Sequence, residues 1–153
     1  MIFTDSSFYP DVSPGYLVRV IHQMSVAAID RTLAEDGMTA TQWMTLVSLY
    51  FNHADTCAGL ARRMAHDKGA MTRIIDQIEA NGWVLRQRDP DDRRVVRLTL
   101  TDAGRAAALS AKQKVIACWN GFLADWSERE VEDLVHMLQR LRNTMEEGDA
   151  CQG

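Results

Sequence analysis

The feature that most constrains this chain is a short amphipathic helix that leads directly into a β-hairpin. Four apolar residues follow the i, i+3, i+4, i+7 spacing of one helix face: Met71, Ile74, Ile75 and Ile78. At 100° per residue, the opposite face carries Gly69, Thr72, Arg73, Asp76 and Gln77. Asn81-Gly82 ends the helix, and the runs 83–88 and 96–100 have the composition of two strands. The pattern predicts a helix with one buried face, one free face and a hairpin beside it.

Capping residues place two more helices before the hairpin. Thr39 and Gln42 form a capping box at the start of one helix. Thr56 caps a short helix, and Asp67 caps the amphipathic helix that follows. Two short helices and a hairpin make a winged helix-turn-helix, in which the second helix is free to enter a major groove.

Longer helices are expected on both sides of this arrangement. Ser13-Pro14 is a favourable start, because Ser caps a helix and Pro suits its first position. Thr101 and Ser127 are expected to cap two further helices, the second with Glu130 in a capping box. The expected boundaries are a loose arm at 1–12 and helices at 13–36, 101–126 and 127–148.

The sequence therefore predicts a mainly α fold with a small β-hairpin wing, in one domain over residues 1–153. Residues 39–101 form the winged lobe, and residues 1–35 and 102–148 are dimerisation helices. Two apolar stripes support dimerisation: Leu17, Val20, Ile21 and Met24, and Val131, Leu134, Leu138, Leu141 and Met145. A single core that absorbs both stripes is the alternative, but one small lobe cannot easily cover so many helices.

Charge is unevenly distributed along the chain. The whole sequence has a net charge of -4, yet residues 60–105 hold ten Lys and Arg against seven Asp and Glu. The rest of the chain is therefore at -7. A basic centre within acidic flanks indicates a surface for a polyanion, although most charged runs are only solvated faces.

Two arginines at the expected hairpin tip, Arg93 and Arg94, favour DNA as that polyanion. A hairpin that ends in arginine can follow phosphates or enter a minor groove, where arginine is favoured. The helix starts at Thr56 and Asp67 offer free backbone amides to phosphate. A helical domain with a surface hairpin is the alternative. The outward Arg73, the two arginines of the hairpin tip and the net positive charge of residues 60–105, called the basic window below, together favour DNA binding over this alternative.

Five segments of the chain form a specific set of motifs. They are Leu60-Ala61-Arg62-Arg63-Met64, Asp67-Lys68-Gly69-Ala70-Met71-Thr72-Arg73, Ile78-Glu79-Ala80-Asn81-Gly82-Trp83, Arg88-Asp89-Pro90-Asp91-Asp92-Arg93-Arg94 and Leu98-Thr99-Leu100-Thr101-Asp102-Ala103-Gly104. This set closely resembles MarR-type (multiple antibiotic resistance regulator) repressors over about residues 56–105. The resemblance implies a symmetric homodimer with interlocked terminal helices and two winged lobes on a pseudopalindromic operator in double-stranded DNA.

The resemblance also assigns roles on the amphipathic helix by position. Thr72 and Arg73 resemble residues that contact bases or phosphates, and Lys68 resembles a phosphate contact at the helix start. Gln77 belongs to the same reading surface. Many relatives have Ser-Thr where this chain has Gly69-Ala70, so two hydroxyl donors are absent. Ala70 can still touch a thymine methyl, and Gly69 allows close approach of the backbone.

In the wing, the resemblance implies that Asp92 braces Arg94. Either Arg93 or Arg94 is then the residue that enters the minor groove, and the sequence does not choose between them.

A small-molecule sensor is a further expectation from the family, whose members commonly bind aromatic or phenolic anions between the dimer helices and the winged lobe. The residues expected to line such a crevice are His22, Met24, Trp43, Met44, Val47, Tyr50, Ile116 and Trp119. For each of them, ordinary core packing is the alternative, and it is the commoner role. His22 is the polar group expected on the inner face of its helix, where it would meet a ligand carboxylate.

Redox sensing is a competing input. Cys57 is placed at the first position of a helix, where backbone amides favour the thiolate, and it lies next to the DNA-reading segment. Cys118 is expected to be buried and inert, and Cys151 lies in the tail. Peroxide-sensing relatives use a cysteine near the start of the first helix, which this chain lacks.

Other classes of function find no support in the sequence. There is no His/Cys pair at metal-ligand spacing, no catalytic motif and no apolar stretch of about 20 residues. The start of the chain lacks the pattern of a signal peptide, so a cytoplasmic protein without metal or membrane partner is expected. We therefore expect a DNA-binding regulator, most often a repressor, that is released by a ligand and is not an enzyme. A dimeric ligand-binding or adaptor protein without DNA binding is the alternative, supported by Gly69-Ala70.

Overall fold

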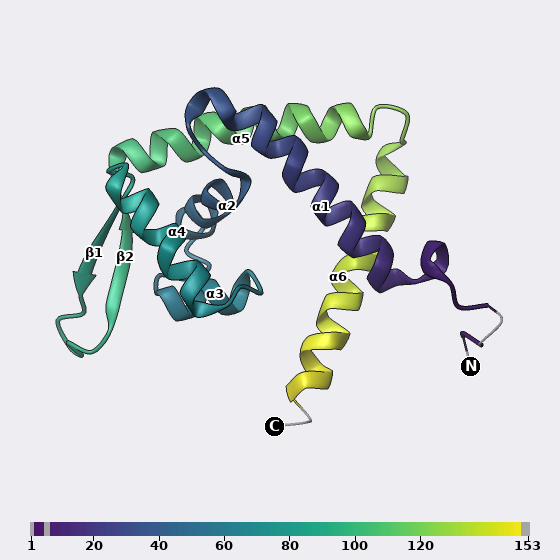
Figure 1. The fold of residues 1–153 in the computed structure, drawn as a ribbon, viewed down its shortest axis with the longest axis horizontal. Helices are drawn as coiled ribbons and strands as arrows, with labels where there is room; N and C mark the ends of the chain where they lie inside the picture. Colours follow the sequence, from purple (N-terminus) through teal and green to yellow (C-terminus); the bar gives the residue numbers. More distant parts are fainter. Residues whose placement is uncertain (1, 5–6, 151–153) are drawn as a thin grey trace. The chain divides into compact units, whose positions relative to one another are not determined.

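The computed structural model describes residues 2–4 and 7–150, with side chains through Gly148. It is mainly helical with one two-stranded sheet, as the sequence predicts. The elements are η1 (Pro10–Val12), α1 (Pro14–Leu33), η2 (Ala34–Asp36), α2 (Ala40–Tyr50), α3 (Cys57–Arg63), α4 (Lys68–Ala80), β1 (Val84–Arg88), β2 (Val96–Leu100), α5 (Asp102–Phe122) and α6 (Glu128–Ala150), labelled in Figure 1. Two compact units divide the chain between Cys118 and Trp119, and each is described by itself.

Helix α4 packs into the core of the first unit with most of its apolar face, although Ile74 stays half-buried. Met71, Ile75 and Ile78 are each 0% exposed. The core that they join also contains Leu33, Leu46, Leu60, Val84, Leu98 and Ala108. In Figure 1, α2, α3 and the hairpin lie around α4. Burial of each such side chain contributes roughly 1.5–3 kcal/mol, so it fixes which face of α4 remains outward.

The predicted caps form as hydrogen bonds. Thr39 and Gln42 make both bonds of the capping box at the start of α2. The Thr56 hydroxyl accepts from the Gly59 amide at 3.1 Å, and the Asp67 carboxylate accepts from the Ala70 amide at 2.9 Å. The starts of α3 and α4 are therefore determined by local sequence.

The hairpin pairs Val84 with Leu100 and Arg88 with Val96 in antiparallel register. Its first strand begins one residue later than predicted, since Trp83 takes part in the turn after α4. The Trp83 amide donates to the Ile78 carbonyl at 2.9 Å, and its own carbonyl accepts from the Thr101 amide at 3.1 Å. Gly82 allows this turn with a φ of 72°.

The start of α5 lies directly against this turn. Thr101 accepts from the Gly104 amide at 2.9 Å, as expected of a cap. A Cβ atom built on Gly104 would stand 1.9 Å from the Trp83 carbonyl oxygen, so only glycine fits there. This close approach joins the base of the hairpin to the first turn of α5.

Several predicted boundaries differ from the structure. The first helix gives way to η2 before Gly37, whose φ is 64°. Helix α5 ends at Phe122 rather than Trp126, because Ser127 leaves the helix to cap α6, with its amide donating to Glu130 at 2.8 Å. Helix α6 continues two residues past Gly148. The arm expected at 1–12 contains the short helix η1.

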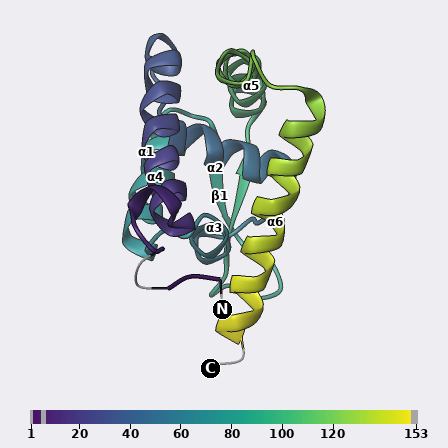
Figure 2. The ribbon, with the colours of Figure 1, turned by 90° about the vertical axis from the view of Figure 1, so that its right-hand side faces the viewer.

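Apolar side chains remain uncovered on several helices. Exposed positions include Leu17, Ile21 and Met24 on α1, and Leu138, Leu141 and Met145 on α6. Helix α6 is uninterrupted along its length (Figure 2) and buries none of its described side chains. Across the described residues, no helix combines the length and hydropathy that a membrane crossing needs.

Candidate nucleic-acid interface

The outward face of α4 presents the residues that the sequence places there. Lys68, Gly69, Thr72, Arg73 and Gln77 are exposed, and Ala70 is half-buried. The turn that leads into α4 holds Ala65 in the left-handed region, with a φ of 51°. Together with the Asp67 cap, this turn fixes the direction of the helix and of its first backbone amides.

Gln77 is held by a partner that the sequence did not predict. The Gln42 side-chain oxygen accepts from the Thr39 amide at 2.9 Å, so its nitrogen is the end that faces Gln77. That nitrogen donates to the Gln77 side-chain oxygen at 3.0 Å. The Gln77 oxygen is thus already engaged once within the protein, and its amide nitrogen remains a donor for an outside partner.

Thr72 is similarly engaged from within the protein. Its hydroxyl donates to the Lys68 carbonyl at 2.8 Å. The same oxygen lies 3.5 Å from the sulfur of Cys57, the first residue of α3. The α3–α4 pair is thus linked by side chains as well as by apolar packing.

A guanidinium fastens α4 to the hairpin. Arg86 of β1 donates to Asp76 at 2.5 Å and also to Glu79. Both carboxylates stand on α4, one turn apart. Helix α4 is therefore held by ion pairs at its outer edge as well as by its buried face.

The wing is organised by Asp89, whose side chain is 9% exposed. Its carboxylate accepts from the Arg97 guanidinium and from the backbone amides of Asp91 and Asp92, at 2.8 and 3.2 Å. These bonds, that from Arg97 first, hold the pKa of Asp89 below its usual value. Arg97 also contacts Asp55, in the turn before α3, at 2.5 Å. One arginine therefore ties the wing to the helix-turn-helix.

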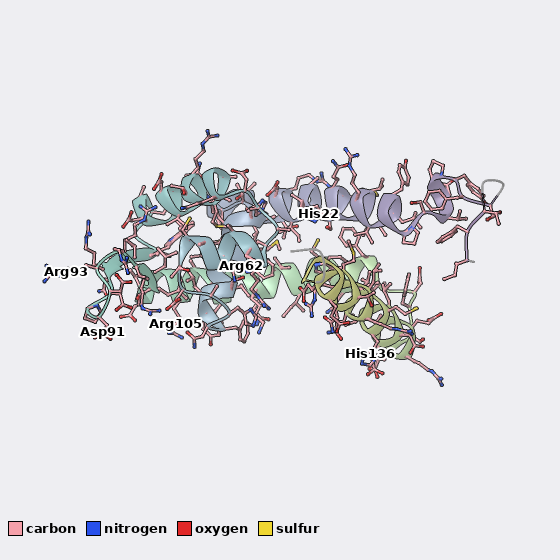
Figure 3. The ribbon with its side chains drawn as sticks, turned by 90° about the horizontal axis from the view of Figure 1, so that it is seen from below. His22, Arg62, Asp91, Arg93, Arg105 and His136 are labelled. Carbon is pink, nitrogen blue, oxygen red and sulfur yellow. The ribbon has the colours of Figure 1, made fainter. Side chains whose placement is uncertain are left out.

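At the tip, Asp92 and Arg94 form the predicted bidentate pair, with both distances 3.1 Å. The bond from Arg94 keeps the pKa of Asp92 below its usual value. Arg93 points away from the hairpin in Figure 3, and its carbonyl accepts from the Arg88 guanidinium at 3.1 Å. The pair leaves Arg94 almost fully exposed at the end of the wing.

These ion pairs account for most of the acidic residues of the basic window. Asp67 caps α4, Asp76 and Glu79 hold Arg86, Asp89 holds Arg97, and Asp92 holds Arg94. Over residues 2–4 and 7–150, the cations of this window without a carboxylate partner are Arg62, Arg63, Lys68, Arg73, Arg88, Arg93 and Arg105. The charges of α3, α4 and the wing that have no ion-pair partner are therefore mostly positive.

Comparison with known proteins identifies the class of protein that carries this surface. The profile of the MarR family matches residues 38–96. The chain is 30% identical to the multiple antibiotic resistance protein MarR of Escherichia coli over 111 residues, 72% of this chain and 77% of that protein. The chain belongs to the MarR family. It is also 33% identical to the HTH-type transcriptional regulator YdgJ of Bacillus subtilis, over 71% of this chain and 66% of that regulator.

Solved structures of MarR proteins agree with the fold. The apo crystal structure of E. coli MarR matches with a TM-score of 0.74 and 27% identity, over 85% of this chain and 97% of that one. CouR of Rhodococcus jostii, bound to p-coumaroyl-CoA, matches at 0.76 over 88% and 95%, with 24% identity. BpsR of Bordetella bronchiseptica, whose DNA binding is regulated by 6-hydroxynicotinic acid, matches at 0.77 over 88% and 96%, also with 24% identity. The chain is therefore a MarR-family transcriptional regulator with a DNA-binding winged helix.

The residues expected to form a MarR effector crevice are spread over α1, α2 and α5. Trp43 and Tyr50 already have partners, since the Trp43 indole donates to the Ala108 carbonyl at 3.3 Å and Arg105 lies 5.1 Å from the Tyr50 ring. His22 is exposed on α1 in the single chain. Among the others, Met24, Met44, Ile116 and Trp119 are exposed and Val47 is half-buried. Trp119 belongs to the second unit and stacks edge-on with Phe122.

The cysteines have different surroundings. Cys57 is half-buried beside Thr72. Cys118 is half-buried rather than buried as expected. Cys151 lies outside the described residues. No group of three or more His, Cys, Asp or Glu that could hold a metal is found in the described part of the chain.

Replacing Asp89 by Asn tests the organisation of the wing. The variant keeps an oxygen for the two backbone amides but loses the charge that pairs with Arg97. We expect faster amide hydrogen exchange in the wing and a lower free energy of unfolding at pH 7. Because the folded pKa of Asp89 is lowered, its contribution is present above the ordinary carboxyl pKa and is lost as the pH falls through the lowered one. The difference from wild type should therefore shrink below about pH 4.

Asp91→Asn is the matched control. Asp91 is exposed at the same tip, and its carboxylate has no hydrogen bond or ion pair within the described residues. Equal losses of stability and protection in the two variants would contradict the organising role of Asp89.

Proposed function

We propose that this MarR-family chain is a homodimeric repressor that acts in the cytoplasm and has no enzymatic activity. Its two winged lobes bind a pseudopalindromic operator, and a small aromatic or phenolic effector releases them. One observation carries the proposal: α4 exposes Lys68 and Arg73, the wing tip exposes Arg93 and Arg94, and Asp76, Glu79, Asp89 and Asp92 beside them are already paired with arginines.

Each element of the lobe has a part in this mechanism. Helix α4 lies in the major groove and presents Thr72, Arg73 and Gln77 to base edges or phosphates. Lys68 and the first amides of α4 contact phosphate, with Gly69 and Ala70 allowing close approach. The wing lies along the adjacent minor groove, where Arg93 or Arg94 enters and Asp92 holds the neighbouring guanidinium in place.

Dimerisation follows from the uncovered apolar faces. Leu138 and Leu141 on α6 and Ile21 on α1 are more than 40% exposed in the single chain, which is costly for side chains of this size. A second copy of the chain would cover these apolar faces and would also supply a second winged lobe. Two half-sites then lie about 34–36 Å apart and are bound together.

Arginine replacements test DNA binding. Arg73→Ala should reduce the free energy of DNA binding by roughly 1–3 kcal/mol. The variant should lose base preference if Arg73 contacts a base, and should bind all sequences more weakly by the same factor if Arg73 contacts phosphate. Arg94→Ala should weaken binding without unfolding the lobe, and each lost phosphate contact should lower the salt slope by about 1. The affinity is measured by titrating the promoter DNA beside the protein's own gene at several salt concentrations. The mass of the complex is measured as well and gives the number of chains bound per operator.

Arg31→Ala is the control, since Arg31 is exposed on α1 outside the basic window. If both test variants bind DNA with wild-type affinity, α4 and the wing are not the surface that contacts DNA. A complex with one chain per operator would contradict the dimer. Absence of any shift, even without ligand, would favour a dimeric adaptor that does not bind DNA.

An aromatic effector is supported by the ligands of two proteins of the same fold, p-coumaroyl-CoA in CouR and 6-hydroxynicotinic acid in BpsR. In a thermal-shift screen of aromatic acids and phenols, a binder at 100 times its Kd should stabilise the protein by about 2.7 kcal/mol. The same compound should release operator DNA, and His22→Ala should weaken both effects if His22 meets the carboxylate. If no aromatic acid or phenol in the screen shifts the melting temperature, an effector of this chemistry is contradicted.

A thiol-based response through Cys57 is the second candidate, favoured by the 3.5 Å distance between its sulfur and the Thr72 hydroxyl. Oxidation at this position would place new oxygen atoms against the reading helix and weaken DNA binding. Cys57→Ser should then bind the operator but resist release by peroxide. Unchanged peroxide release in this variant would exclude Cys57 as the sensor.

A further inference from the structure

The hydroxyl of Thr72 has no free hydrogen for DNA. It donates its one proton to the Lys68 carbonyl at 2.8 Å, the back-bond that threonine forms in helices. The Cys57 sulfur lies 3.5 Å from the same oxygen, and its thiol also reaches the Lys68 carbonyl oxygen at 4.0 Å. The hydroxyl of Thr72 is therefore turned toward the start of α3.

The methyl group of Thr72 is therefore the part of the side chain left for the operator. The Cβ atom of threonine carries its oxygen and its methyl in different directions, and the oxygen is turned toward Cys57. Thr72 is nevertheless exposed on the outward face of α4. Building on the proposed function, we propose that Thr72 reads the operator through this methyl group, in contact with the 5-methyl of a thymine in the major groove.

The neighbouring residues favour the same base. Gly69 and Ala70 add no hydroxyl, and Gln77 offers its amide nitrogen as a donor while its oxygen already accepts from Gln42. The carboxylate of Asp76 is paired with Arg86. This face of α4 thus offers a methyl group and donors, and thymine is the base whose major-groove edge combines a methyl group with an acceptor oxygen.

Replacing thymine by deoxyuridine tests the contact, because it removes only the 5-methyl group. The probe is the promoter DNA beside the protein's own gene, with the bound segment defined by footprinting and each thymine in it replaced in turn. At one symmetric pair of positions, wild-type affinity should fall by roughly fourfold per half-site, the value of one buried methyl group. Replacement elsewhere should change affinity little.

Two variants of Thr72 separate its methyl from its hydroxyl. Thr72→Val keeps the methyl and removes the hydroxyl, so its preference for thymine over uracil at that position should equal the wild-type value. Thr72→Ser keeps the hydroxyl and removes the methyl, so the preference should disappear. Each ratio is measured within one protein preparation, so a loss of folded protein cancels. Thr99→Ser on β2 is the control, since it makes the same chemical change away from α4 and should keep the full ratio.

The outcomes are distinct. A wild-type protein that binds the operator with no thymine–uracil difference at any position would overturn the inference. So would a preference that survives in Thr72→Ser and is lost in Thr72→Val, because the hydroxyl would then be the reading group. A wild-type protein that does not bind DNA would instead overturn the proposed function itself.

Discussion

The complete burial of three side chains of α4 determines what the rest of the lobe can do. Met71, Ile75 and Ile78 lie in the core, so the opposite side of the helix must face outward. Turning α4 by one residue would bring Thr72, Asp76 and Glu79 into the apolar core, where unpaired polar groups cost several kcal/mol each. The same apolar contacts therefore specify both the position of the helix and the identity of its reading face.

Ion pairs also connect the elements of the lobe, and they determine which of its cations remain unpaired. Arg86 and Arg97 join separate elements, α4 to β1 and the wing to the turn before α3. Exposed ion pairs of this kind contribute little stability individually, with a median of about 0–1 kcal/mol. Their larger consequence is electrostatic, because they use the carboxylates nearest the reading face and leave Lys68, Arg73 and Arg93 to act on an outside polyanion.

Local sequence predicted most of the lobe, because caps and apolar spacing act over a few residues. Thr56, Asp67 and Thr101 each form the expected bond, and the first strand begins one residue later than predicted, after Trp83. The partners that restrict the reading residues could not be predicted. Gln42 lies 35 residues from Gln77, and Cys57 lies 15 from Thr72. No local pattern marks such contacts; they appear only once α2, α3 and α4 pack together.

These restrictions affect which contacts of the lobe supply affinity for DNA and which supply sequence specificity. With Gly69 and Ala70 lacking hydroxyls and with Thr72 and Gln77 partly engaged, few groups on α4 remain to form hydrogen bonds with bases. Phosphate contacts must then supply most of the affinity, and they carry no sequence information directly. Under the proposed function, one lobe alone would bind many sequences weakly. Selectivity would then come from two correctly spaced half-sites and from contacts to methyl groups and groove shape. The uncovered faces of α1 and α6 and the few base-reading groups of α4 both favour the proposed pair of lobes over a single lobe.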